Sequence, residues 1–223
     1  MHNALSLNSA LLAAAIASLV AIPRPADAIV LNYNSMATFS AATGSSSLVD
    51  FTGTSFDGLT PSGANLWIAN SPAGFSLGGA TFSIPSGQLY IIAPALSPAF
   101  YDRGTGNILH ADIGRPITIS FSTPINAFAL DLSSFQSRAG TVTLSFTNGD
   151  ASTAILGNPL AFNGYISDSS FSAVTIGGLA GQYLIVDNIR YANILPAASV
   201  PEPANLALFG FGLAVLAARR LRA

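Results

Sequence analysis

The chain of 223 residues contains no cysteine and no lysine, and its only glutamate is Glu202. Without cysteine, an exported form of this protein has no disulfide bridges, so its stability must come from burial, hydrogen bonds or a bound metal ion. A zinc site would lack its usual ligands as well, because the histidines are His2 and His110 alone.

Charged residues are scarce, at 8% of the chain. Between residues 29 and 196 the sequence has eight aspartates and the four arginines Arg103, Arg115, Arg138 and Arg190, so this part is mildly acidic. Nucleic acid is excluded as a partner, since its phosphates need clustered Lys or Arg. Disorder is excluded too, because 50% of the residues are hydrophobic.

An apolar segment lies near the N-terminus, from Ala10 to Ile22, and Ala26-Asp27-Ala28 follows it. An apolar run that ends in an A-x-A-type site predicts a secretory signal peptide over residues 1–28, exported by the Sec machinery and cleaved after Ala28. The segment departs from the usual pattern because no Lys or Arg precedes the apolar run. The mature protein is expected to begin near Ile29.

A second apolar segment lies at the C-terminus. Pro201-Glu202-Pro203 is followed by an apolar run from Leu206 to Ala218 and then by Arg219, Arg220 and Arg222. The two prolines keep Glu202 extended and accessible. The run is shorter than the roughly 20 residues that cross a bilayer comfortably, and the arginines are expected to stay cytoplasmic, which puts residues 29–200 on the other side of that membrane.

This tail resembles the PEP-CTERM sorting tail of bacterial exported proteins, with motif, apolar run and arginines in the same order. The resemblance implies recognition and cleavage near Pro201–Pro203 by an exosortase, an integral-membrane cysteine transpeptidase. It also implies a transient stay in the cytoplasmic (inner) membrane, followed by delivery to the cell surface or the extracellular polysaccharide. We therefore expect three parts: a signal peptide (1–28), one domain (29–196) and a sorting tail with a short transmembrane helix (197–223).

The central part has the pattern of an all-β protein. After a short predicted helix, Ser35 to Ala42, with Met36 and Phe39 on one side, ten short β-rich runs are separated by Gly, Pro, Asn and Ser. The predicted strands are Leu48–Phe51, Ala80–Ile84, Gln88–Ile92, Ile117–Phe121, Ala127–Leu132, Thr141–Thr147, Ser152–Leu156, Ala161–Tyr165, Phe171–Ile176 and Tyr183–Tyr191. This number and spacing predict a β-sandwich.

A hairpin is predicted at Asn148-Gly149, whose two residues are expected to supply the positive φ values of a tight turn. Two long segments, Thr52 to Gly79 and Ala93 to Gly114, are rich in Gly, Ser and Pro and are expected to be irregular loops. Long loops on a rigid β scaffold are where binding sites usually lie.

Several segments together resemble a jelly-roll-like β-sandwich domain of PEP-CTERM proteins, which is similar to some carbohydrate-binding modules. They are the opening helix, Val49-Asp50-Phe51, the Ala127–Asp131 strand and Val186-Asp187-Asn188-Ile189. The resemblance implies that Asp187 helps to ligate a structural calcium ion. The alternative is that Asp187 and Asn188 only hydrogen-bond nearby backbone at a strand end.

Chemistry-bearing side chains are few. The rings of Trp67, Tyr90, Tyr101, Tyr165 and Tyr183 include candidates for a platform on which a sugar stacks, although a sandwich core also uses aromatic rings. His110 is the only histidine of the mature domain; without a G-x-S-x-G motif it is expected to be a loop or surface residue rather than part of a serine hydrolase. A glycosidase needs two facing carboxylates, which eight scattered aspartates do not by themselves predict.

The expected function is therefore that of an exported surface or extracellular-matrix protein, structural or adhesive, and not an enzyme. Glycan binding through the loops is the specific hypothesis. A secreted polysaccharide hydrolase and a permanently membrane-tethered surface protein remain as alternatives.

Overall fold

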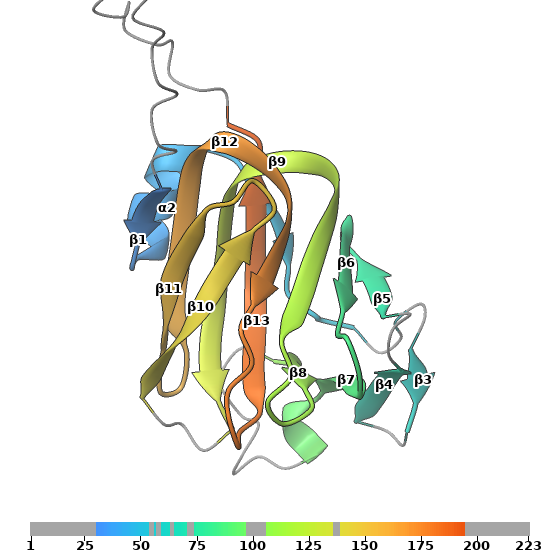
Figure 1. The fold of residues 1–223 in the computed structure, drawn as a ribbon. Coiled ribbons are helices and arrows are strands. Elements are labelled where there is room, and N and C mark those ends of the chain that lie inside the picture. Colours follow the sequence, from blue (N-terminus) through green and yellow to red (C-terminus); the bar gives the residue numbers. More distant parts are fainter. Residues whose placement is uncertain are drawn as a thin grey trace, which may run out of the picture.

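The structure is a computed structural model that describes residues 30–53, 56, 59–62, 65–70, 74–96, 106–135 and 139–194. It is an all-β sandwich with one short helix (Figure 1). The signal peptide and the sorting tail predicted from the sequence lie outside the described residues.

The elements follow one another along the chain as β1 (Val30–Tyr33), α2 (Met36–Thr43), β2 (Ser47–Val49), β3 (Thr60–Pro61), β4 (Leu66–Asn70), β5 (Phe75–Leu77), β6 (Ala80–Ser83), β7 (Gln88–Ile92), the 3₁₀ turn η1 (Pro94–Leu96), β8 (Ile108–Ala111), β9 (Ile117–Ser134), β10 (Gly140–Phe146), β11 (Ala151–Leu156), β12 (Ala161–Ile176) and β13 (Leu184–Ala192).

Two long strands, β9 of 18 residues and β12 of 16, build both layers of the sandwich. They are paired antiparallel along their length, and the pairing shifts register between Ile166 and Phe171, opposite the exposed Ser122–Pro124. Both strands bend over at one end of the molecule (Figure 1). The sequence predicts four separate strands here, and the structure joins them in pairs because a register shift lets a strand bend without ending.

The second half of β9 pairs with β13, and the sheet continues through β8, β7 and β4 to β3, with β1 on the free side of β12 and β2 beside β13. We call this the β13 layer. The first half of β9 and the second half of β12 form the opposite layer with β10, β11, β6 and β5, which we call the β10 layer.

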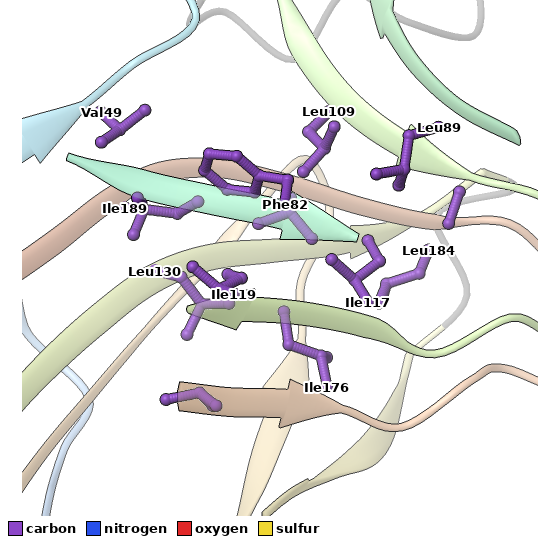
Figure 2. Close-up of a cluster of buried hydrophobic side chains, with 14 of the residues drawn as sticks. Val49, Phe82, Leu89, Leu109, Ile117, Ile119, Leu130, Ile176, Leu184 and Ile189 are labelled. Atoms are coloured by element: carbon purple, nitrogen blue, oxygen red, sulfur yellow. The ribbon is translucent and has the colours of Figure 1, made fainter. Parts of the chain in front are cut away.

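The main core lies between these layers. Alternate residues of each strand point into it, as Ile117, Ile119 and Phe121 do from β9. Figure 2 shows Phe82 of β6 surrounded by apolar side chains that include Leu109, Leu130 and Ile189. Burial on this scale supplies the stability that a chain without disulfides needs.

The helix α2 covers one end of the outer face of the β13 layer. Its Phe39 is fully buried against Ala127, Ala129 and Ile166. The expected helix is confirmed to within one residue at each end, but Met36 is 51% exposed and does not share the buried side with Phe39.

Both ends of the described chain lie at this corner, where Tyr33 and Ile194 pack against the same cluster (Figure 1). Asn126, only 4% exposed, holds Ile194 with two hydrogen bonds: its Nδ2 donates to the Ile194 carbonyl oxygen at 2.8 Å, and its Oδ1 accepts from the Ile194 N–H at 2.8 Å. The domain is therefore fastened where the sorting tail begins.

Two local expectations were wrong in detail. At the β10–β11 hairpin only Gly149 has a positive φ, because the connection is a three-residue loop in which Phe146 pairs with Asp150 across the turn. The segments expected to be irregular contain β3, β4, β5 and β8. These strands are short and flanked by Gly and Pro, so they contain too few residues for a hydrophobic alternation to be recognised in the sequence.

Candidate functional site

His110 was expected in a loop or on the surface, and this is wrong. It lies on β8, whose four residues are all buried, and its side chain is 3% exposed. Its neighbours Leu109 and Ala111 point into the main core. His110 itself points to the outer face of the β13 layer, where it pairs across the sheet with Tyr90 of β7 and Ile185 of β13.

A row of rings crosses this outer face. His110 stacks on Tyr183, with ring centroids 4.4 Å apart, and meets the Tyr90 ring edge to face at 5.5 Å. Phe135 meets the other side of the row, 5.5 Å from Tyr183. Each ring packs against at least one other, so the row is rigid before any ligand arrives.

Polar groups fix one end of the row. The Tyr90 hydroxyl lies 2.8 Å from Gln88 Oε1 and 3.0 Å from Asp112 Oδ1, and its single proton is shared between these two acceptors. The other carboxylate oxygen of Asp112 accepts the Gln88 N–H at 2.8 Å. Asp112 therefore holds both the strand and the tyrosine, and its partly exposed carboxylate remains at the rim of the row.

A groove of about 210 Å³ opens beside these rings, lined by Leu66, Tyr90, Ile92, Leu96, His110 and Tyr183. Leu96 comes from η1 and is 45% exposed, so it forms the outer wall. The groove has aromatic faces and aliphatic walls. Asp112 is not one of the lining residues, but its Oδ1 lies 3.0 Å from the hydroxyl of Tyr90, which is one. Such a mixture of apolar surface and few polar groups is typical of small-molecule sites.

Burial determines the charge of His110. It lowers the imidazole pKa from 6.5 to about 4, against a smaller opposing effect of the Asp112 carboxylate. At neutral pH the groove therefore contains a neutral imidazole ring, suited to packing rather than to acid catalysis.

The sequence named five rings as candidates for a platform, and the structure brings Tyr90 and Tyr183 together with His110. Trp67 is 6% exposed and packs against Phe56 in the main core, at 5.1 Å between ring centroids. Tyr165 is 2% exposed and lies in the same core. Tyr101 is outside the described residues.

Sequence reasoning missed His110 and Phe135 as members of this row. The available signal for His110 was the short, nearly continuous apolar run Ile108-Leu109-His110-Ala111, which is typical of a strand buried on both faces.

Asp187, the proposed calcium ligand, lies in β13 rather than at a strand end and is fully buried. It pairs across the sheet with Asp131, which places two carboxylates on one face. Asn188, at φ 48°, bridges them: its N–H donates to Asp187 Oδ1 at 2.7 Å, and its Nδ2 donates to Asp131 Oδ2 at 2.9 Å. Burial raises the Asp131 pKa, while the Asn188 hydrogen bond and the Arg190 charge act the other way.

These two aspartates are cross-strand neighbours, but they line neither the groove nor a second hollow in the described part of the chain. The second of these hollows, about 350 Å³, is lined by Ser45 to Ser47 and by Tyr191, Ala192 and Asn193. Among the described residues no group of three or more His, Cys, Asp or Glu side chains is placed to hold a metal ion.

The remaining residues singled out in the sequence lie outside the described ranges. They are the cleavage-site residues Ala26 and Ala28, the motif Pro201-Glu202-Pro203, and the tail arginines Arg219, Arg220 and Arg222. Within the part that is described, no helix has the length and hydropathy to cross a membrane.

Comparison with known families tests the tail directly. Residues 199–222 match the PEP-CTERM protein-sorting motif. This match confirms the resemblance seen in the sequence and supports an exported protein that is processed at the membrane by an exosortase-type system. The sorting motif covers the tail alone and says nothing of the domain before it.

No curated protein matches the chain. Among solved structures, a family 11 carbohydrate-binding module from Clostridium thermocellum, in complex with a β-1,3-1,4-mixed-linked tetrasaccharide, is similar at 13% identity and a TM-score of 0.34, over 68% of this chain and 98% of that one. The catalytic domain of a GH87 alpha-1,3-glucanase in complex with nigerose is similar at 17% identity and a TM-score of 0.30. It covers 44% of this chain, which spans 24% of the glucanase chain. At such scores neither likeness carries an argument about function.

Proposed function

We propose that this protein is a surface or extracellular-matrix protein, sorted through its C-terminal motif, that binds polysaccharide through the groove beside Tyr90, His110 and Tyr183. Its role is adhesive or structural. The sorting part rests on the motif match, and the binding part rests on the groove.

The single observation that carries the binding proposal is the rigid row of rings next to a polar rim. Sugars have apolar C–H faces that pack on aromatic rings, and hydroxyl groups that need acceptors at the edge. The groove offers the rings of Tyr90 and Tyr183 for packing, and Asp112, whose Oδ1 lies 3.0 Å from the Tyr90 hydroxyl, is the nearest carboxylate acceptor that we assign to it. The rings contact one another, so little ordering entropy is lost on binding.

Binding of the full-length protein to polysaccharide from its host's matrix tests this proposal. The protein is held in a zwitterionic detergent without a sugar headgroup, since a glycosidic detergent would compete for the groove. We expect Tyr183→Ala to weaken binding about tenfold or more, because the variant loses buried apolar area together with about 0.5–1.5 kcal/mol of ring stacking.

Tyr33→Ala is the matched control, because Tyr33 is also a partly exposed tyrosine on this layer but packs against Phe39 at the opposite corner. Leu96→Ala is a second groove variant that leaves the sheet intact, as Leu96 is on η1 and largely exposed. If the wild type and both groove variants bind equally well, the groove is not the binding site. The same conclusion follows if the wild type binds no polysaccharide with or without calcium.

We also propose a structural calcium ion at Asp187, on the strength of its oxygen donors. The carboxylates of Asp187 and Asp131 are cross-strand neighbours, and the Asn188 Nδ2 that donates to both would have to give way to the ion. Calcium prefers several such oxygens. Millimolar calcium is expected to raise the unfolding temperature of the wild type but not of Asp187→Asn, with magnesium as the control ion. An unfolding temperature insensitive to calcium and to chelator would leave the Asn188 hydrogen bonds as the whole role of Asp187.

A further inference from the structure

We infer that the groove binds a single ring of a neutral sugar, at a chain end or branch. Asp112 makes the groove prefer neutral sugars, because it accepts hydrogen bonds from the hydroxyl groups of the sugar. The inference rests on the proposed glycan binding and adds the class of ligand and its mode of entry.

The size of the groove limits what enters it. Sites for drug-sized ligands enclose about 300–1,000 Å³. At about 210 Å³ the groove is smaller than these, and its aliphatic wall ends in Leu96. It therefore has room for one sugar ring rather than for a run of several.

The arrangement of the rings leads to the same conclusion. A platform for an extended chain needs several ring faces exposed side by side. Within the row, His110 stacks on Tyr183 and is itself only 3% exposed, so the ring faces are turned toward each other and do not form a continuous exposed surface. The surface left for a ligand is that of Tyr183 and Tyr90, with Leu66 and Ile92 beneath.

Asp112 gives the groove its chemical preference. A carboxylate has about four lone-pair sites. The hydrogen bonds from Tyr90 and from the Gln88 N–H use one on each oxygen. Asp112 is partly exposed, and the Tyr90 ring whose hydroxyl it binds lines the groove. The further sites accept hydroxyl donors, which a neutral sugar supplies on every side.

The same carboxylate acts against acidic sugars. A uronic acid would bring a second negative charge close to Asp112 in a groove partly shielded from water, where repulsion is stronger than in bulk solvent. A neutral hexose meets no such penalty. We therefore expect the groove to discriminate between sugars by charge as well as by size.

A chain-length series decides the mode of entry. Calorimetric titrations of the full-length protein in the same detergent would use glucose, mannose and galactose, their neutral oligosaccharides of two to six rings, and uronic-acid oligosaccharides of the same lengths. We expect the affinity for the best neutral series to change less than about threefold between two rings and six, and the acidic series to bind at least tenfold more weakly.

An affinity that rises tenfold or more from two rings to six would overturn the single-ring mode while leaving glycan binding in place. Equal or tighter binding of the acidic series would overturn the role of Asp112. No binding of any sugar, together with none of matrix polysaccharide, would mean that the proposed function itself is wrong.

Asp112→Asn tests the residue. The amide keeps the shape but removes the charge, so the ratio of neutral to acidic affinity is expected to fall at least fivefold. A merely structural role, through Gln88 and Tyr90, would weaken both series alike and leave that ratio unchanged. Asp168→Asn is the matched control, since Asp168 is exposed on β12 and away from the groove.

Discussion

At the scale of single residues, His110 shows how burial changes what a side chain can do. A histidine in a loop titrates near pH 6.5 and is available for catalysis or metal binding. On β8, between Tyr90 and Tyr183, the same side chain is kept neutral and acts as a third aromatic ring. The groove is rigid because His110 is neutral and packs against both tyrosine rings.

His110 therefore makes stability depend on pH. Because its folded pKa is lowered to about 4, the unfolded chain binds a proton below pH 6.5 that the folded chain does not. Stability is thus full above pH 6.5 and is lost as the pH falls toward 4, by on the order of 3 kcal/mol from this group.

His110→Phe keeps a ring but removes the titration. We expect the free energy of unfolding of the variant, relative to the wild type, to rise by about that amount between pH 7 and pH 4, measured by urea denaturation at each pH. A difference between the two proteins that stays constant with pH would show that His110 is protonated equally in both states.

At the scale of elements, the contact between α2 and β12 depends on a glycine. Gly164 has no side chain at the point where Phe39 lies on the sheet, and a Cβ there would be 2.8 Å from Phe39 Cδ2 and 3.0 Å from Phe162 Cε1. Both neighbours are large rings, and Phe39 is fully buried. The helix can lie against the sheet only because this position is empty.

We expect Gly164→Ala to destabilise the domain by about 1–3 kcal/mol, the usual cost of overpacking. Gly140→Ala on β10 is the control, because its Cβ would lie at an ordinary 3.5 Å from Leu156 Cδ1. Thermal unfolding of the two variants tests this. A lower unfolding temperature for Gly164→Ala alone supports the close contact between α2 and the sheet, and equal unfolding temperatures for the two variants contradict it.

The elements also show what the sequence can and cannot predict. The sequence was enough to place β10 and β7. β10 alternates between exposed and buried residues from Thr141 to Phe146, and β7 contains an unbroken apolar run after Gln88. β8 was missed because its outer face is covered too: Tyr183 stacks on His110, and Ile108 lies in a cluster against which Leu160 packs, so all four residues are buried. The groove depends on which loops and rings lie over that face, and this is a property of the tertiary structure.

At the scale of the whole molecule, β13 connects the groove to the point where the tail leaves the domain. Tyr183 lies directly before β13, and Ile194, held by Asn126, follows its end (Figure 1). A strand of 9 residues extends about 30 Å. The groove is therefore at the end of the domain remote from the tail.

The seven Cα–Cα steps from Ile194 to Pro201 reach at most about 25 Å. In the membrane-held form that we propose, the corner with α2 is thus kept near the bilayer, and the groove lies about one strand length farther from the tether. We expect the full-length protein in liposomes to bind sugar with the same affinity, within about twofold, as the form released into the host's medium. Calorimetry on both forms measures this, and mass spectrometry of the termini identifies them. A tethered form that binds tenfold more weakly would place the groove against the membrane and would make cleavage of the tail the step that activates binding.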